Sequence, residues 1–368
     1  MKEIVYIHKD RFERRPPVIS AVMILADLGY NVTLIDEGVS DNWKEILLQK
    51  GVACHEIIPS GKRDIVSKFM IYYLFKKKCS EILIGMGNPV IWVEGHPALF
   101  SLGSLINKYR HILQIQELHD TSKLFMKATR KVINSASLVF MPEYNRSVLY
   151  QVWFGMKKRA VVLPNKPYFI PSKDELSRLK IKYASLVEEI GEKKVFLYQG
   201  YLDEDRDISS VISAIKRMGD EYRVVLVGKD LAGMMEKYKR IDEKIVYIEY
   251  LPAPDYLLFT SMAFIGIMTY TPTHLNNVFC APNKIFEYSA FGLPMIGNDI
   301  PGLKALEYEK AGEVADFGDE EGIFKSIKKL VDDYDTYSMH SRAFFERTDN
   351  KLTIKNALDK SNLFEEYK

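Results

Sequence analysis

The chain has 368 residues, of which 47% are hydrophobic and 27% charged, and its formal net charge is +2. This length suffices for two domains with separate cores, and the composition is that of a globular protein without low-complexity tracts. An odd number of cysteines, three, argues against a disulfide framework, and their spacing does not match a metal site. No apolar run reaches the length of a membrane span, and the first residues read as a strand rather than a secretion signal. We therefore expect a cytoplasmic protein.

The charge is unevenly distributed. Residues 1–170 contain 24 Lys and Arg against 15 Asp and Glu (+9), whereas residues 171–368 contain 27 against 34 (−7). A basic half suits an anionic membrane surface or an anionic acceptor, and simple scatter of charge is the alternative. Within residues 1–170, the segment 62–78 has basic residues on both sides of an apolar, aromatic centre. This pattern fits either a helix resting on a membrane surface or a buried helix with charged ends.

Strand and helix patterns alternate along the first part of the chain, which predicts a parallel sheet with helices on both faces. Ligands of such a sheet bind at the carboxyl ends of its strands. The predicted strands cover 4–8, 31–36, 53–57, 82–85, 90–94, 112–117, 138–142 and 160–163, and the predicted helices cover 17–28, 43–50, 64–77, 99–109, 122–134 and 146–154.

A proline-rich segment at 163–172 indicates a domain boundary. A charged helix over 173–189 follows, and the alternation then begins again. Its predicted strands cover 195–199, 222–227, 245–248 and 264–268, and its helices cover 208–217, 234–240, 254–260 and two segments after 320 and 332. We therefore predict an α/β protein with an N-terminal domain over 1–166, a second domain over 167–349 and a final helix over 350–368.

The segment 281–297, A-P-N-K-I-F-E-Y-S-A-F-G-L-P-M-I-G, predicts a loop, a short helix, a turn and a buried strand. Pro282 suits the helix start, Asn283 suits the N-cap, and Gly292 suits the residue just past the helix end. Lys284 beside free N–H groups suits a phosphate, and Glu287 one turn later suits two vicinal hydroxyls such as those of a ribose. This is half of a nucleoside-diphosphate site. The alternative is a helix packed on a sheet with both charges solvated.

Residues 282–294, P-N-K-I-F-E-Y-S-A-F-G-L-P, resemble the signature of nucleotide-sugar glycosyltransferases of the GT-B fold, especially those of the retaining family 4. The resemblance implies two Rossmann-like, doubly wound domains with the donor in an interdomain cleft and a last helix that crosses back to the N-terminal domain. It also implies that Glu287 holds the donor ribose and that the helix start holds the diphosphate. The usual second glutamate is Phe279 here, so sugar contacts are expected from backbone groups between Phe279 and Ala281.

The family carries Gly-Arg and a later lysine on the diphosphate in the first loop of the second domain. Here Gly200 is kept, Tyr201 replaces the arginine, Arg206 replaces the lysine, and Lys284 or Lys229 is the candidate for the missing cation. Asp-Glu-Asp at 203–205 matches a metal motif of another glycosyltransferase fold, but we interpret it as solvated and expect no metal. The remaining expected donor contacts are Gly228, Lys229, Tyr250, Leu251, Pro282 and Asn283.

Two segments of the N-terminal domain are candidates for the acceptor side. The loop H-K-D-R-F-E-R-R-P-P contains Arg14 and Arg15, whose guanidinium groups suit phosphate or carboxylate, although a solvated loop is the alternative. The segment Q-E-L-H-D-T-S contains His119, to which the resemblance assigns contact with the donor sugar, with His96 as the weaker rival. Asp120, the next residue, is a further acceptor-side candidate. The other alternative is a structural histidine that caps the following helix together with Asp120.

The predicted function is transfer of a sugar, with retention, from a nucleotide sugar to a saccharide or lipid-linked saccharide in cell-surface polysaccharide synthesis. The expected catalytic residues are His119, Arg206 and Lys284, and the leaving group itself takes the acceptor proton. Side chains do not distinguish the base, but we favour a UDP-sugar over a GDP-sugar and expect no cofactor and no nucleic acid. The alternatives are a sugar-nucleotide 2-epimerase, for which no cluster of acidic and histidine residues is evident, and a non-catalytic nucleotide-sugar-binding protein. We expect the protein to meet its acceptor at the inner membrane face, through peripheral contact with the membrane.

Overall fold

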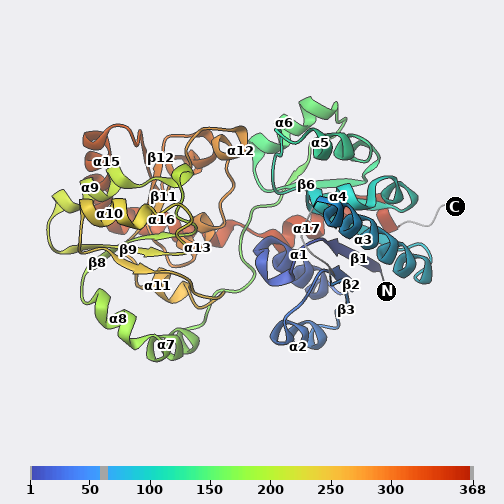
Figure 1. Ribbon diagram of the computed structural model, residues 1–368, viewed down its shortest axis with the longest axis horizontal. Coiled ribbons are helices and arrows are strands. Elements are labelled where there is room, and N and C mark those ends of the chain that lie inside the picture. Colours follow the sequence, from blue (N-terminus) through green and yellow to red (C-terminus); the bar gives the residue numbers. More distant parts are fainter. Residues whose placement is uncertain (1, 59–64, 365–368) are drawn as a thin grey trace. The chain divides into compact units, whose positions relative to one another are not determined.

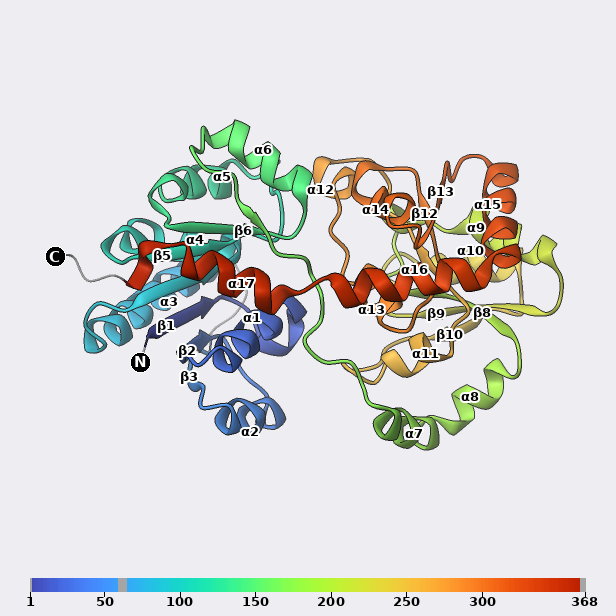
Figure 2. The same cartoon turned by 180° about the vertical axis from the view of Figure 1, so that it is seen from behind.

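The structure is a computed structural model that describes residues 2–58 and 65–364, with only the backbone described for 65–68. The chain divides into two compact units (Figures 1 and 2). Unit 1 contains residues 1–168 and 349–368, and unit 2 contains residues 169–348. Each unit has one parallel sheet with helices on both of its faces. This is the doubly wound α/β arrangement that the alternating pattern predicts.

The sheet of unit 1 has seven strands in the order β3-β2-β1-β4-β5-β6-β7. Its central strands are buried on both sides, which explains their continuous apolar sequences. The register pairs His8 with Glu94 and Glu94 with Gln114, so polar side chains from neighbouring strands lie in one row at the carboxyl edge. The strands are β1 (Glu3–His8), β2 (Asn31–Asp36), β3 (Ala53–Glu56), β4 (Val90–Glu94), β5 (His111–Gln114), β6 (Leu138–Met141) and β7 (Val161–Val162).

The helices of unit 1 correct one prediction. Residues 82–85, predicted as a strand, continue helix α3, because Phe75, Cys79 and Leu83 form a buried stripe at helical spacing. No helix in the described part of the chain is long and apolar enough to cross a membrane. The helices are α1 (Pro16–Asp27), α2 (Asp41–Gln49), α3 (Ile65–Gly85), α4 (Gly95–Leu102), α5 (Lys123–Arg130), α6 (Tyr144–Phe154) and α17 (Asn350–Asp359).

The last helix, α17, packs against α1 within unit 1 (Figure 2). Ile354 and Leu358 belong to the same core cluster as the α1 residues Val22 and Leu25. The helix predicted over 350–368 ends at Asp359 and is followed by a short 3-10 turn at Asn362–Phe364. Residues 365–368 lie outside the described part of the chain.

The sheet of unit 2 has six parallel strands in the order β10-β9-β8-β11-β12-β13. The sequence pattern missed β13, because its sequence G-E-V-A forms neither an apolar run nor a clear alternation, and its two middle residues are only half-buried. The strands are β8 (Lys194–Gln199), β9 (Tyr222–Val227), β10 (Val246–Ile248), β11 (Ile265–Met268), β12 (Met295–Asn298) and β13 (Gly312–Ala315).

Ten helices of unit 2 flank this sheet in the described part of the chain. The predicted helix over 173–189 is in fact two helices that meet at Tyr183, and the predicted helix over 254–260 begins only at Leu257. The helices are α7 (Lys173–Lys182), α8 (Ala184–Ile190), α9 (Ser209–Met218), α10 (Met234–Ile241), α11 (Leu257–Met262), α12 (Leu275–Val278), α13 (Lys284–Ala290), α14 (Ala305–Tyr308), α15 (Glu320–Asp332) and α16 (Tyr334–Arg347).

Helix α13 is buried against the sheet of unit 2. The ring of Tyr288 lies so close to Gly266 on β11 that a Cβ there would come within 2.4 Å of it, and the Tyr288 hydroxyl accepts the Gln199 backbone N–H (3.3 Å). Gly292 has φ 70° just past the helix end, in agreement with the prediction. The predicted side-chain cap is wrong: Asn283 has helical dihedral angles and its side chain makes no cap bond.

Candidate functional site

The first residue of α13 contributes a buried cation. Lys284 is 9% exposed, and its Nζ lies 4.2 Å from the ring centroid of Tyr198 and 5.6 Å from that of Tyr270. Among the described residues, Nζ has no hydrogen-bond partner. Burial, together with the positive charge of Arg206, lowers the pKa of Lys284 to about 7. A buried ammonium without an anionic partner is costly, and so this arrangement favours a bound anion.

Two glycines bring the neighbouring backbone close to this cation. A Cβ on Gly200 would lie 3.2 Å from Lys284 Nζ, and a Cβ on Gly228 would lie 1.9 Å from the Gly200 carbonyl oxygen. Gly200 has φ 132° and Gly228 has φ 144°, conformations that other residues rarely adopt. Arg206 also approaches, with Cζ 5.5 Å from the Tyr270 centroid. The structure therefore gathers the predicted residues Gly200, Arg206 and Lys284 around one pair of tyrosines.

The second charge of α13 belongs to a hydrogen-bond network. Glu287 is 4% exposed; its Oε1 accepts from the Tyr256 hydroxyl (2.6 Å), and its Oε2 accepts from Gln199 Nε2. Thr260 Oγ1 donates to Gln199 Oε1 (2.7 Å). Burial raises the pKa of Glu287, while the Tyr256 and Gln199 bonds oppose that rise. The alternative in which Lys284 and Glu287 are merely solvated is therefore wrong.

Sequence reasoning missed the two hydrogen-bond partners of Glu287, Tyr256 and Gln199, and also Thr260, which bonds to Gln199. The one available signal was Gln199, a polar residue at the end of a buried strand, where ligand-site residues of parallel sheets gather. Tyr256 and Thr260 gave no local signal, because they lie on a separate helical segment that only the tertiary fold brings to α13.

The remaining predicted donor residues lie along the strand ends and before α13. Tyr201 and Tyr250 are 54% and 62% exposed, and Lys229 Nζ lies 5.3 Å from the Tyr250 ring centroid. The residues nearest α13 are more enclosed. Phe279, Ala281 and Asn283 are half-buried, as is Leu251 after β10, whereas Pro282 is buried.

In the acidic segment 203–205, Glu204 and Asp205 are exposed, in agreement with the interpretation as solvated, but Asp203 departs from it. Asp203 is half-buried, and its Oδ1 is buried without a hydrogen-bond partner among the described residues. Asp205 is exposed, and its Oδ1 accepts from the Thr273 hydroxyl (3.2 Å). Over residues 2–58 and 65–364, no three His, Cys, Asp or Glu side chains are grouped as metal ligands.

In unit 1, His119 follows β5 with φ 49° and is half-buried. Its ring lies 4.5 Å from the ring of His96 and 5.1 Å from that of Phe125. His96 is 1% exposed, its Nε2 lies 2.9 Å from the Tyr150 hydroxyl, and burial lowers the pKa of His96 to about 3. Burial also lowers the pKa of His119, so both imidazoles are neutral at pH 7. The structure therefore places the two predicted histidines together.

The other predicted acceptor-side residues are Asp120, Arg14 and Arg15, and they do not belong to the histidine pair. The alternative in which Asp120 caps the next helix is wrong, because Ser122 is the N-cap residue and its Oγ accepts the Phe125 N–H (3.5 Å). Arg14 and Arg15 are exposed, and both form ion pairs with Asp10, at 3.5 Å and 3.7 Å. These two guanidinium groups remain accessible from solvent.

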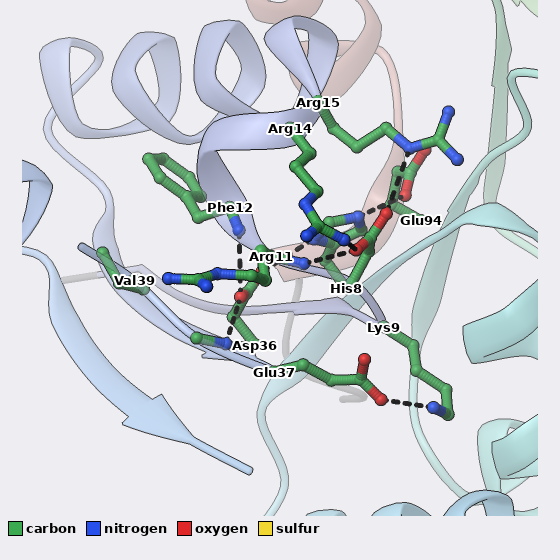
Figure 3. Close-up of polar contacts among 12 residues, drawn as sticks. His8, Lys9, Arg11, Phe12, Arg14, Arg15, Asp36, Glu37, Val39 and Glu94 are labelled. Carbon is green, nitrogen blue, oxygen red and sulfur yellow. Dashed lines mark hydrogen bonds and ion pairs between the residues drawn. The ribbon is translucent and has the colours of Figure 1, made fainter. Parts of the chain in front are cut away.

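Three buried ionisable side chains lie side by side at the carboxyl edge of unit 1 (Figure 3). His8 Nδ1 lies 2.7 Å from Asp36 Oδ2 and His8 Nε2 lies 3.5 Å from Glu94 Oε2. The three side chains are at most 5% exposed. Asp36 Oδ1 also accepts the backbone N–H groups of Phe12 (3.1 Å) and Gly38 (2.8 Å). We name this group the His8 triad.

The His8 triad places one imidazole between two carboxyl groups. With Nδ1 as the donor to Asp36, a hydrogen bond between Nε2 and Glu94 needs a proton on one of these two groups. Burial lowers the pKa of His8, but the Asp36 hydrogen bond and the Glu94 charge outweigh it and raise that pKa; burial raises the pKa of Glu94. The expectation that acidic and histidine residues are not clustered is therefore wrong for unit 1. The cause is that the three residues end three different strands.

Comparisons with known proteins agree with this fold. Residues 193–333 match the family model described as glycosyl transferases group 1. The comparison with curated protein sequences gave no match.

Solved structures are similar over nearly the whole chain. HepE from Anabaena in complex with UDP-glucose has a TM-score of 0.74 at 13% identity, covering 98% of this chain and 99% of that chain. Sucrose-phosphate synthase from Thermosynechococcus elongatus has a TM-score of 0.69 at 13% identity, with 98% and 99% covered. A protein from Listeria monocytogenes assigned as a UDP-N-acetylglucosamine 2-epimerase has a TM-score of 0.63 at 14% identity, with 99% and 97% covered. The two parallel, Rossmann-like sheets and these likenesses show that the chain has the GT-B fold.

Proposed function

We propose that the chain is a glycosyltransferase that moves a sugar from a nucleoside-diphosphate sugar to a saccharide. The observation that carries the proposal is the buried ammonium of Lys284, which has no hydrogen-bond partner among the described residues and lies three residues before the buried carboxylate of Glu287. A diphosphate would supply the missing anion, and a ribose would supply hydroxyl donors to the carboxylate. Both groups lie in the part of unit 2 that matches the glycosyl transferases group 1 model.

In this proposal, unit 2 stabilises the departing diphosphate electrostatically. Lys284 and Arg206 provide two positive charges beside a backbone that Gly200 keeps uncovered. Charge placed in advance where charge develops is an effective means of lowering a reaction barrier. The helix start contributes little, because α13 has only seven residues.

A UDP-sugar is the favoured donor and retention the favoured outcome. The donor choice is supported by HepE, the similar structure whose complex contains UDP-glucose. Retention is supported by the resemblance of residues 282–294 to the signature of retaining enzymes. We also propose that turnover needs no divalent metal, since Lys284 and Arg206 serve the diphosphate. EDTA should leave the rate unchanged; loss of turnover that Mg²⁺ or Mn²⁺ restores would contradict this.

We further propose that unit 1 meets a lipid-linked or anionic acceptor at a membrane surface in cell-surface polysaccharide synthesis. The exposed side of α3 presents Phe69 (59% exposed), Met70 (52%) and Tyr73 (62%), followed by Lys76–Lys78. Apolar rings beside lysines suit the boundary between acyl chains and anionic headgroups. Residues 59–64, the start of the basic segment noted in the sequence, lie outside the described residues.

A binding and turnover series tests the proposal. UDP, GDP, ADP and dTDP would be titrated calorimetrically into the full chain, and UDP-sugars would then be incubated with and without saccharide acceptors. We expect UDP to bind and UDP to be released only when an acceptor is present. Tight binding without release would identify a non-catalytic binding protein. Absence of binding by every nucleotide would reject the proposed site.

One observation favours a second candidate, a sugar-nucleotide 2-epimerase. The His8 triad is a cluster of acidic and histidine side chains of the kind that proton abstraction from a sugar requires. One of the similar structures is also assigned as a UDP-N-acetylglucosamine 2-epimerase. Formation of the 2-epimer from a UDP-sugar without acceptor would identify this activity. We rank it second because the charged groups of the His8 triad are paired with one another, whereas Lys284 Nζ has no hydrogen-bond partner among the described residues and so favours a bound anion.

A further inference from the structure

The carboxylate of Glu287 is held on both oxygens by neutral protein donors. Tyr256 occupies Oε1 at 2.6 Å, and Gln199 Nε2 occupies Oε2. An ionised carboxylate only accepts, so Gln199 turns its Nε2 toward Glu287 and its Oε1 toward Thr260, whose hydroxyl donates to it at 2.7 Å. The bonds on the two oxygens together restrict rotation of the carboxylate.

Tyr256 and Thr260, which hold the carboxylate directly and through Gln199, come from one helical segment. Tyr256 precedes helix α11 directly and Thr260 lies four residues later, so the two side chains share a face of the helix. Asp255, the residue before Tyr256, is anchored at the C-terminal end of α7. Its Oδ2 lies 2.7 Å from Lys182 Nζ and 2.6 Å from the Tyr183 hydroxyl. The position of the Tyr256 hydroxyl is therefore set by packing as well as by its bond to Glu287.

This arrangement leaves free acceptor capacity on the carboxylate. An ionised carboxylate offers about four lone-pair sites, and the protein donors use one on each oxygen. The remaining capacity, one site on each oxygen, matches a ligand with two adjacent hydroxyls. If the carboxylate rotated freely, it would accept one hydroxyl as readily as two.

We propose that Tyr256 is a positioning residue, which orients the Glu287 carboxylate to accept both hydroxyls of the donor ribose and thereby sets a preference for ribose over 2′-deoxyribose. This inference rests on the proposed function, because it takes Glu287 as the ribose contact. Thr260 supports the same orientation more weakly, through Gln199.

The test compares the affinities of UDP and 2′-deoxy-UDP by calorimetry. The wild-type chain should bind UDP about tenfold more tightly, the order expected for one hydrogen bond to a charged group. Tyr256→Phe should reduce this ratio severalfold, through weaker UDP binding with little change for 2′-deoxy-UDP. Thr260→Val should reduce it less. The matched control is Tyr308→Phe, since Tyr308 is 80% exposed on the same unit and should leave the ratio unchanged.

Three outcomes would overturn the inference. If Tyr256→Phe weakens both nucleotides equally, the tyrosine merely supports the fold. If the variant binds UDP more tightly, the tyrosine hydroxyl occupies the place of a ribose hydroxyl. Absence of UDP binding by the wild-type chain would remove the proposed function itself. Circular dichroism of each variant separates these outcomes from misfolding, and Thr260→Val gives an independent reading if Tyr256→Phe does not fold.

Discussion

Both units bury ionisable side chains at the carboxyl ends of their strands, but they balance the charges differently. In unit 1, His8 lies between Asp36 and Glu94, so the buried charges have partners within the protein. In unit 2, Lys284 has no hydrogen-bond partner in the described chain, and Glu287 is held by neutral donors only. Because removing an unpaired charge from water is costly, the unbalanced cluster indicates a charged ligand and the balanced one does not require it.

The strongest test of this contrast removes the histidine of the balanced cluster. His8→Leu leaves Asp36 and Glu94 facing an apolar side chain, and breaking a buried pair in this way should lower the free energy of unfolding of unit 1 by about 3–5 kcal/mol. UDP binding by unit 2 should not change. The measurement is urea unfolding followed by tryptophan fluorescence, which reports unit 1 because it contains all three tryptophans, Trp43, Trp92 and Trp153.

The matched control for this variant is His55→Leu, because His55 is exposed on β3 of the same sheet. It should leave the stability of unit 1 nearly unchanged. Equal stability of His8→Leu and wild type would show that the His8 triad contributes nothing to folding. The cluster would then be better explained by catalysis, in line with the second candidate function.

Replacing the buried basic residue of unit 2 by an apolar one should not lower the stability of the protein. Lys284→Met removes an unpaired buried charge, so the free protein should be as stable as the wild type or more stable. UDP affinity should fall about 10- to 100-fold, because charged hydrogen bonds to phosphate contribute about 1.5–3 kcal/mol. Calorimetry and thermal melting measure the two effects. Lys325→Met, at an exposed position, is the control; unchanged UDP affinity of Lys284→Met would contradict the site.

The unbalanced cation also predicts a pH dependence. The pKa of Lys284 is about 7 in the free protein, against an ordinary value of 10.5, and a bound phosphate favours its protonated form. UDP binding above pH 7 therefore takes up a proton, and affinity should fall by up to about tenfold per pH unit. The free energy of unfolding of the ligand-free protein should rise with pH between about 7 and 10.5. In that range the lysine is protonated in the unfolded chain but largely deprotonated in the folded one.

Calorimetry between pH 6.5 and 8.5, in two buffers with different ionisation enthalpies, measures both affinity and proton uptake. Lys284→Arg should bind UDP with a nearly flat pH profile, since arginine stays charged throughout this range. A flat profile for the wild-type chain, with no proton uptake, would mean that Lys284 is already charged in the free protein.

The smallest expected effect per residue concerns the outer surface of unit 1. Changing Lys76, Lys77 and Lys78 to Gln should weaken sedimentation with anionic vesicles by about 1 kcal/mol for each lysine, and added salt should have a similar effect. The control changes an exposed basic triplet elsewhere in unit 1, Lys157, Lys158 and Arg159, to Gln. Equal loss in both variants would indicate general charge attraction, and binding that ignores lipid charge would leave a soluble acceptor as the better proposal.

The sequence by itself determined most of the order of strands and helices, with exceptions such as β13, the helical segment at 82–85 and the break at Tyr183, and it determined the place of α13. Secondary structure follows the period of apolar residues, a local property, so the alternation across both sheets was readable. Segment 281–297 was readable for the same reason: a short helix, its terminal Gly292 and the following strand all depend on neighbours in the chain.

Only the tertiary structure decided which charges are buried and with what partners. The solvated and buried alternatives for Lys284 and Glu287 have the same local pattern, and they differ only through Tyr198, Tyr256 and Gln199, which come from other elements. The His8 triad likewise joins the ends of β1, β2 and β4. Such clusters form through contacts between residues far apart in the chain, and the periodicity of one segment does not record them.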